Sequence, residues 1–187
     1  AIALAAQVIR DSGVAVEVLD VGGGFPAAYP DVTPPPLGAF MDAIRAAFAE
    51  AALPGVELWA EPGRALVAGG ASIVVQVQAR RGQELFVNDG VYGGLSDAGP
   101  VIGFRFPARM IRPEGASRAP LAPFAFFGPT CDSADRMDGP FLLPADIAEG
   151  DWIEIGQLGA YGACLRTAFN GFDRAGMAEV ADAPLIE

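Results

Sequence analysis

The sequence predicts an α/β segment over residues 1–70, followed by an antiparallel all-β segment over residues 71–187. In the first segment, apolar stretches of helical length alternate with stretches of strand length, a pattern typical of parallel strand–helix–strand units. In the second, short stretches rich in Val, Ile and Phe follow one another between Pro, Gly and Asp turns. An apolar fraction of 52% with 19% charged residues indicates a folded chain.

Each element of the first segment has its own signal. AIALAAQVIRDSG is apolar but has neither a basic start nor a small-residue cleavage pattern, so it predicts an amphipathic helix inside a larger fold, which Gly13 ends as a C-cap. The start without a methionine adds to the expectation of a missing upstream part. VEVLDV predicts a strand over residues 16–21, LGAFMDAIRAAFAEAAL a helix over 37–53 and VELWA a strand over 56–60. This succession indicates a parallel crossover unit, whose two strands need further strands to close a sheet.

The second segment reads as a series of strands. SIVVQVQARR and ELFVNDG flank a short turn, and FRFPARMI, LAPFAFFG and DWIEIGQLG follow them. After the last strand we expect a short helix over residues 160–166 and then the segment TAFNGF. The whole segment therefore predicts an antiparallel β domain.

The composition excludes several classes of partner and site. The net charge is −11 and all twelve cations are scattered arginines, so nucleic acid and anionic membranes are poor partners. No apolar run is long enough to span a membrane. Two cysteines without any histidine form neither a disulfide framework nor a His/Cys zinc site, so we expect no metal and a reduced, cytoplasmic protein.

A glycine loop follows the first predicted strand. Gly22, Gly23 and Gly24 begin a nominal dinucleotide-binding fingerprint, but the prolines that follow block the helix this fingerprint requires. Backbone amides in such a loop can approach a phosphate closely. The alternative is a tight turn without a ligand.

Glu61, Gly63 and Arg64 follow the second parallel strand, so they emerge at the same sheet edge as the glycine loop. Glu61 is an anion that could meet a protonated ring nitrogen, while Gly63 and Arg64 could supply an amide and a guanidinium to a phosphate. The alternative is a helix N-terminal turn with Arg64 in solvent.

Three further positions carry chemistry in the β segment. Cys131 precedes Asp132 at the mouth of a turn, where a thiol could donate a proton beside a carboxylate; the alternative is a small buried residue before an Asp cap. Tyr161 could donate its hydroxyl to a phosphate, and Phe169 and Phe172 could wall a pocket, although both features also fit core aromatics.

Five motifs in order, LDVGGGFP, EPGR, VNDGVYG, GPTCDSAD and GAYGACLRTAFNGF, resemble the fold type III pyridoxal-phosphate amino-acid decarboxylases, most closely the ornithine decarboxylase branch. The resemblance implies an alanine-racemase-like fold, in which a (β/α)8 barrel that binds pyridoxal phosphate is joined to a β domain. Residues 1–70 would be the last part of the barrel. Residues 71–187 would be the C-terminal β domain with a return segment to the active site.

The resemblance also implies which residues hold the cofactor. Its phosphate would be bound by Gly22, Gly23, Gly24, Gly63, Arg64 and Tyr161. Glu61 would keep the ring nitrogen protonated, a state that the ring requires to accept electrons from the substrate.

Other residues would face the substrate. Cys131 matches the residue that returns a proton to the substrate, and Asp132 matches the carboxylate that receives its distal ammonium. Phe169 matches a pocket wall, and Asp97 would stand in for a specificity aspartate that eukaryotic ornithine decarboxylases carry in a longer segment. The pair CD after GPT, in place of CE, favours ornithine or lysine as substrate.

The activity implied is decarboxylation of L-ornithine or L-lysine to a diamine such as putrescine, by a homodimer with shared active sites and as part of a longer chain. In the family, the Schiff-base lysine and the histidine that stacks on the cofactor lie upstream, and this sequence contains neither residue type. We therefore expect the chain alone to be inactive. Two alternatives stay open: a non-catalytic homologue that regulates polyamine supply by binding partners, and an inactive truncation.

Overall fold

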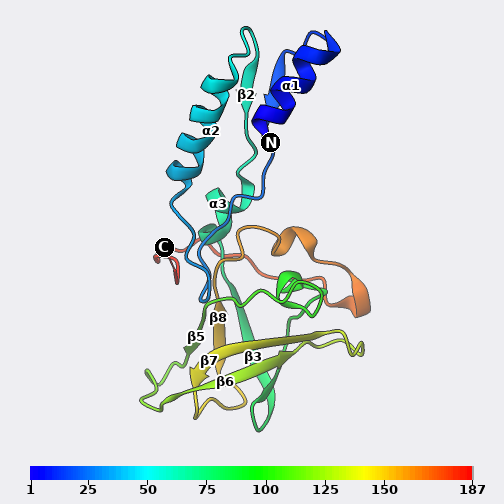
Figure 1. Ribbon diagram of the computed structural model, residues 1–187. Coiled ribbons are helices and arrows are strands. Elements are labelled where there is room, and N and C mark those ends of the chain that lie inside the picture. Colours follow the sequence, from blue (N-terminus) through cyan, green and yellow to red (C-terminus); the bar gives the residue numbers. More distant parts are fainter. Residues whose placement is uncertain (187) are drawn as a thin grey trace. The chain divides into compact units, whose positions relative to one another are not determined.

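The computed structural model describes residues 1–186 and divides the chain into two compact units (Figure 1). The first unit contains Ala1–Ala27 and Thr33–Leu66, and the second contains Ala28–Val32 and the chain from Val67 onward. The short stretch Ala28–Val32, which the sequence assigns to the first part, thus clusters with the second unit.

The first unit is a parallel strand–helix–strand unit preceded by a helix, as predicted. Its elements are α1 (Ile2–Ser12), β1 (Val18–Asp20), α2 (Leu37–Ala51) and β2 (Glu57–Trp59). β1 and β2 pair in parallel, with Val18 opposite Glu57. Gly13 ends α1 with φ 65°, a left-handed conformation that glycine adopts without steric cost. Both strands are shorter than the sequence predicts.

The second unit is built on a six-stranded sheet with the order β5-β8-β3-β4-β6-β7. The strands are β3 (Ile73–Arg81), β4 (Glu84–Val87), β5 (Ala108–Ile111), β6 (Leu121–Phe127), β7 (Arg136–Pro144) and β8 (Trp152–Ile155). Figure 1 shows β6 and β7 crossing β3 and β8, and the two outer strands β5 and β7 contact each other, so the sheet is curled.

Three features of the second unit differ from the prediction. β4 and β6 pair in parallel, so the sheet is mixed and not wholly antiparallel. β7 lies in RMDGPFLLP, whose internal Gly-Pro reads as a turn and hid the strand. The helix expected over residues 160–166 is wrong, because only a 3₁₀ turn, Ala163–Leu165, forms there.

Short helical segments complete the described chain. They are α3 (Gly63–Val67) and the 3₁₀ turns η1 (Ala68–Gly70), η2 (Ser96–Ala98), η3 (Ala163–Leu165) and η4 (Phe169–Gly171). Between residues 1 and 186, no helix combines the length and the apolar character that crossing a membrane requires.

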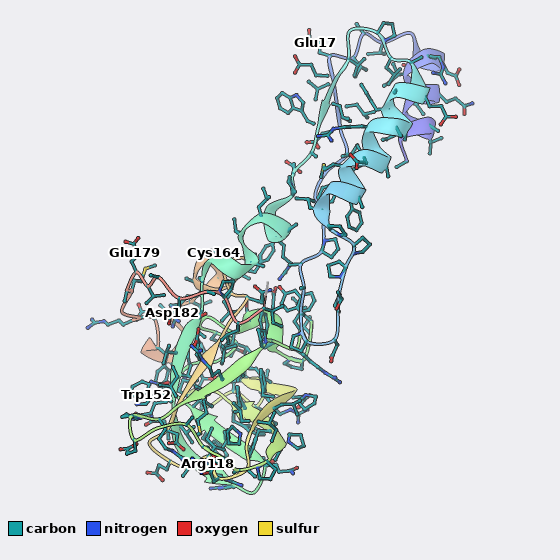
Figure 2. The ribbon with its side chains drawn as sticks, turned by 90° about the vertical axis from the view of Figure 1, so that its left-hand side faces the viewer. Glu17, Arg118, Trp152, Cys164, Glu179 and Asp182 are labelled. Atoms are coloured by element: carbon teal, nitrogen blue, oxygen red, sulfur yellow. The ribbon has the colours of Figure 1, made fainter. Side chains whose placement is uncertain are left out.

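The core of the second unit lies inside the curled sheet. Phe126 and Phe141 stack with ring centroids 3.9 Å apart and are almost completely buried. Buried residues alternate with more exposed ones along β3, because successive side chains of a strand point to opposite faces. Figure 2 draws these side chains and labels Trp152 of β8, which is 37% exposed.

The stretch Ala28–Val32 joins this unit through an aromatic cluster. Tyr29 is 5% exposed, stacks on Phe104 at 5.0 Å and meets Phe106 edge-on at 5.5 Å. The side-chain amide of Gln157 donates a hydrogen bond to the carbonyl of Ala28 at 2.8 Å. Aromatic stacking and a buried polar contact therefore hold the stretch in place.

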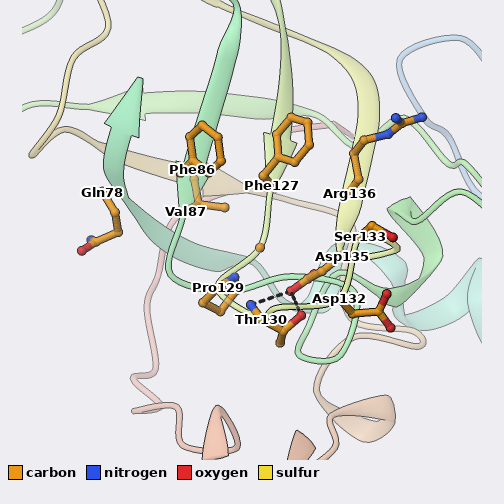
Figure 3. A pocket seen from close by; sticks show the side chains of 11 residues that line it. Gln78, Phe86, Val87, Phe127, Pro129, Thr130, Asp132, Ser133, Asp135 and Arg136 are labelled. Atoms are coloured by element: carbon orange, nitrogen blue, oxygen red, sulfur yellow. Dashed lines mark hydrogen bonds between the residues drawn. The ribbon is translucent and has the colours of Figure 1, made fainter. Parts of the chain in front are cut away.

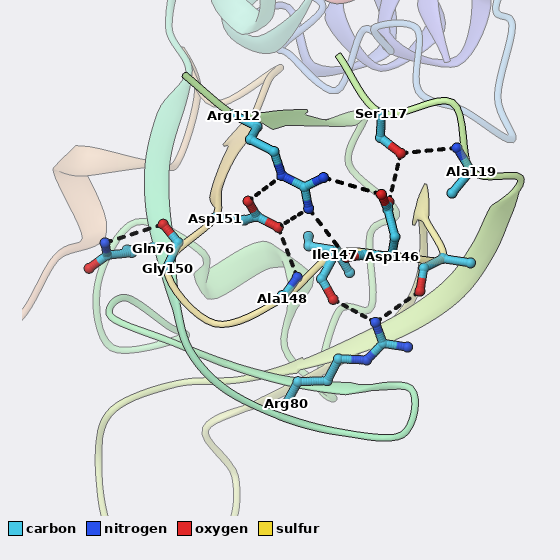
Figure 4. A network of polar contacts seen from close by, with 11 residues as sticks. Gln76, Arg80, Arg112, Ser117, Ala119, Asp146, Ile147, Ala148, Gly150 and Asp151 are labelled. Carbon is cyan, nitrogen blue, oxygen red and sulfur yellow. Dashed lines mark hydrogen bonds and ion pairs between the residues drawn. The ribbon is translucent and has the colours of Figure 1, made fainter. Parts of the chain in front are cut away.

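An arginine network fixes the turn between β7 and β8 (Figure 4). Arg112 binds Asp151 with two nitrogens, at 2.7 and 2.6 Å, and reaches Asp146 at 3.2 Å. Arg80 donates to the carbonyl of Ile147 at 2.5 Å. The hydrogen bonds from the Arg112 guanidinium hold the pKa of Asp151 below its usual range, so the pair stays ionised at neutral pH.

Candidate functional site

The glycine loop and the Glu61 turn meet within the first unit, at the carboxyl ends of β1 and β2. The amide of Val21 donates to the carbonyl of Trp59 at 3.0 Å, and the amide of Glu61 donates to the carbonyl of Gly22 at 2.9 Å. These bonds continue the parallel pairing past the last strand residues. The two motifs that the sequence singles out at this edge are therefore adjacent.

Gly23 shows how close this approach is. A Cβ placed on Gly23 would lie 2.7 Å from the carbonyl oxygen of Glu61, so a larger residue does not fit. The amide of Gly22 donates to the Asp20 carboxylate at 2.8 Å, while within residues 1–186 the amides of Gly23 and Gly24 have no protein acceptor. A narrow turn with two available backbone amides has the features that bind a phosphate.

The other predicted phosphate ligands are Gly63, Arg64 and Tyr161. Gly63 donates its amide to the carbonyl of Glu61 at 2.8 Å, a bond that would have to break before this amide bound a phosphate. Arg64 lies on α3. Tyr161 belongs to the second unit, is 49% exposed and has φ 58°, and its carbonyl accepts a hydrogen bond from Ser96 at 3.2 Å. Their contact with a phosphate stays a prediction.

A second cluster forms in the β unit around Cys131 and Asp132, in the turn after β6. Tyr92 donates a short hydrogen bond to one carboxylate oxygen of Asp132, and the amide of Ala134 donates to the other at 2.9 Å. The bond from Tyr92 holds the pKa of Asp132 below its usual range and raises the pKa of the Tyr92 phenol. Asp132 is therefore an anion at neutral pH beside the exposed thiol of Cys131.

Asp135 stabilises this turn through its buried carboxylate, a role that the sequence analysis did not predict. Its carboxylate is 3% exposed and accepts hydrogen bonds from the amides of Val91 and Thr130, at 2.8 and 3.0 Å, and from the Thr130 hydroxyl at 2.7 Å. A Cβ at Gly90 or Gly128 would overlap this carboxylate. The last aspartate of GPTCDSAD thus ties this turn to the VNDGVYG loop.

The segment after residue 165 returns to the same place. Arg166 and Asp89 form an ion pair at 2.5 Å with side chains only 13% and 10% exposed. The amide of Thr167 donates to the carbonyl of Tyr92 at 2.8 Å, and the Phe169 ring lies 4.5 Å from the Tyr92 ring. Residues 166–169 at the start of the return segment are therefore attached to the VNDGVYG loop.

The structure brings together three of the predicted substrate-site residues, Cys131, Asp132 and Phe169, through their shared neighbour Tyr92 and the return segment. Asp97 differs from them. It lies in η2, is 3% exposed, and its carbonyl accepts a hydrogen bond from the amide of Phe104 at 2.9 Å. Its burial does not favour the substrate contact predicted for it.

A groove of about 590 Å³ runs beside the cluster on the β unit (Figure 3). Phe86 and Phe127 stack along it at 5.2 Å, while Thr130, Asp132 and Asp135 border its polar part. Its volume is in the range of small-molecule sites. The groove has an apolar wall, and Arg136 lies beside the two carboxylates at its polar part.

Two family models match the chain. Residues 1–68 match the pyridoxal binding domain of the pyridoxal-dependent decarboxylases, and residues 70–159 match their C-terminal sheet domain.

Curated relatives span several substrates. The chain is 31% identical to an ornithine decarboxylase of Panagrellus redivivus, covering 87% of this chain and 41% of the relative. It is 35% identical to a diaminopimelate decarboxylase of Actinosynnema pretiosum, covering 93% and 40%. It is also 28% identical to antizyme inhibitor 2 of Xenopus laevis, covering 90% and 40%. The chain thus spans about two fifths of the length of these relatives.

A solved structure supports the same fold. The lysine/ornithine decarboxylase of Vibrio vulnificus, complexed with putrescine, matches with a TM-score of 0.72 and 34% identity, over 93% of this chain and 48% of that one. The expected fold class is confirmed: a partial (β/α)8 barrel followed by a β domain, with the mixed pairing noted above. Pyridoxal phosphate is confirmed as the cofactor.

Proposed function

The chain belongs to the pyridoxal-dependent decarboxylases, and on this premise we propose that it is part of a longer polypeptide that decarboxylates L-ornithine or L-lysine to a diamine. The observation that carries the proposal is the contact between Tyr92 and Asp132 beside the Cys131 thiol. An ionised carboxylate next to a thiol suits a substrate with a distal ammonium and a step that needs a proton.

The first unit would hold the cofactor. The amides of Gly23 and Gly24 would bind its phosphate, with the Arg64 guanidinium, and the Glu61 carboxylate would face its ring nitrogen. When bound, pyridoxal phosphate supplies a ring that accepts electrons from the substrate, provided that this nitrogen is protonated. Glu61 would sustain that protonation by its negative charge.

The β unit would recognise the substrate. Asp132 would bind the distal ammonium, and the hydrogen bond from Tyr92 keeps that carboxylate charged. Phe169 would cover the alkyl chain. Asp97 would join the substrate site only after its side chain became accessible. The Vibrio vulnificus relative is complexed with putrescine, which supports a substrate with an alkyl chain that ends in an amine.

Cys131 would supply the proton that replaces the lost carboxyl group. We further propose a cytoplasmic homodimer in which Glu61 and Cys131 of one chain serve different active sites. The symmetry of a closed dimer then gives two equivalent sites, each built from two chains.

A second candidate is a non-catalytic homologue that binds a protein partner. One observation favours it: the similarity to antizyme inhibitor 2 of Xenopus laevis. The two candidates differ in whether the intact protein releases CO2.

The test uses the full-length protein with pyridoxal phosphate and measures CO2 release from L-ornithine, L-lysine, L-arginine and meso-diaminopimelate. We expect ornithine or lysine to be preferred, and Cys131→Ala to lower kcat while the matched control Cys164→Ala leaves it unchanged. Release from none of the four amino acids would contradict the enzymatic proposal.

Subunit mixing tests the shared site. Glu61→Ala and Cys131→Ala variants, each nearly inactive, are mixed 1:1 and allowed to exchange. Random exchange makes about half of the dimers mixed, so about a quarter of all sites would be intact. If activity stays at the level of the parents although a tag shows exchange, the two residues do not serve separate sites as proposed.

A further inference from the structure

Asn170 contacts the sulfur of Cys131. Its side-chain amide nitrogen lies 3.3 Å from the Cys131 Sγ atom and donates a hydrogen bond to it, although the two residues are 39 positions apart. Asn170 has φ 53°, a left-handed conformation that asparagine tolerates better than most residues other than glycine. This conformation interrupts the helical dihedral angles of η4 at Asn170.

The segment that carries Asn170 is anchored at several points. The buried ion pair between Arg166 and Asp89 fixes its start, and the amide of Thr167 donates to the Tyr92 carbonyl. The Phe169 ring, adjacent to Asn170 in sequence, packs on the Tyr92 ring. Tyr92 in turn holds Asp132, the neighbour of the cysteine. Tyr92 of the VNDGVYG loop therefore contacts the sequence neighbours of both Asn170 and Cys131.

We propose that Asn170 is a positioning residue for Cys131, which orients the sulfur and favours its thiolate by donating an N–H. The inference rests on the proposed function, in which Cys131 gives up a proton. A donor that favours the thiolate makes the thiol a better acid, since it stabilises the form left after the proton has gone. No bond is made or broken by Asn170 itself.

Two substitutions separate this role from a structural one. Asn170→Gly keeps access to the left-handed conformation but removes the donor. Asn170→Asp keeps the shape and also tolerates that conformation, but it replaces the donor with an anion that disfavours a thiolate. A structural role predicts that the rate of Cys131 alkylation differs little between wild type and Asn170→Asp. The positioning role predicts that this rate is highest in wild type, lower in Asn170→Gly and lowest in Asn170→Asp.

The experiment measures alkylation of the intact protein by iodoacetamide across pH. Trypsin places Cys131 on the peptide 119–136 and Cys164 on the peptide 137–166, so mass spectrometry follows each thiol separately. Both cysteines are exposed, and Cys164 serves as the internal control in every variant. Thermal melting of each variant checks that the fold is retained.

We expect Cys131 alkylation at pH 7.5 to slow about threefold in Asn170→Gly and about tenfold in Asn170→Asp, with its pH profile moved to higher pH, while Cys164 changes less than twofold. Equal rates at Cys131 in all three proteins, or changes no larger than those at Cys164, would overturn the proposal. Alkylation needs neither cofactor nor turnover, so its outcome is separate from that of the CO2 assay.

Discussion

Replacing Asp135 tests how the turn that carries Cys131 is held. Three donors converge on this buried carboxylate, the amides of Val91 and Thr130 and the Thr130 hydroxyl. A hydrogen bond to a charged group contributes about 1.5–3 kcal/mol, and water partly replaces the carboxylate because both donor residues are only half-buried. We therefore expect Asp135→Ala to lower the unfolding free energy by about 3–5 kcal/mol.

Asp135→Asn is the informative comparison. The asparagine oxygen can still accept both bonds from Thr130, but its NH2 group then faces the amide of Val91. We expect Asp135→Asn to lower the unfolding free energy by about 2 kcal/mol, less than Asp135→Ala does. Asp138→Ala is the matched control, since Asp138 pairs with Arg136 on the surface, where its side chain is 61% exposed, and it should cost no more than about 0.5 kcal/mol.

The assay is urea unfolding followed by the fluorescence of Trp152. The other tryptophan, Trp59, lies in the first unit, so a Trp59→Phe background isolates the signal of the second. The midpoint and slope give the change in unfolding free energy. If Asp135→Ala costs no more than Asp138→Ala, the three hydrogen bonds do not stabilise the turn and the reasoning is refuted.

Further predictions concern pH, the substrate carboxylate and the cofactor turn. The folded-state pKa of Asp151 is lowered, so its stabilising effect is complete above the unfolded pKa of about 4 and is lost as pH falls through the folded-state pKa. In Asp151→Asn the urea midpoint should therefore decrease less between neutral and acidic pH than it does in wild type. Tyr92→Phe removes the main cause of the low pKa of Asp132, so NMR titration should show that pKa rising. Gly23→Ala brings a methyl group against the Glu61 carbonyl and should weaken binding of pyridoxal phosphate to the full-length protein about tenfold or more, measured by fluorescence. The 187-residue chain has no lysine, so borohydride should trap no side-chain adduct of pyridoxal phosphate, and a stable adduct found by mass spectrometry would contradict this.

Local signals predicted much of the fold. β3 (Ile73–Arg81) and α2 (Leu37–Ala51) carry long periodic patterns, and Gly13 marks the end of a helix as expected. The parallel pairing of β4 with β6 has no comparable signal, because it joins strands separated by another strand that pairs elsewhere. Local hydrophobic periodicity therefore predicts single helices and strands, but not which distant strands pair with each other.

The site shows the same division. Cys131, Asp132 and Phe169 were predicted from their motifs, but Asn170 and Asp135 were not, although both lie inside quoted motifs. The contact of Asn170 with Cys131 and the bond from Val91 to Asp135 join residues about 40 positions apart, which spacing alone does not reveal.

The path of the chain through Ala28–Val32 has a consequence for dissecting the protein. The polypeptide enters the second unit at residue 28, leaves after residue 32 and re-enters at residue 67, so no single cut separates the units. A polypeptide begun at Val67 would lack Tyr29, which stacks on Phe104 and meets the buried Phe106 edge-on. Simple truncation would expose this aromatic surface and favour aggregation. To produce the β unit alone, the stretch Ala28–Val32 has to be kept by circular permutation or by a grafted copy.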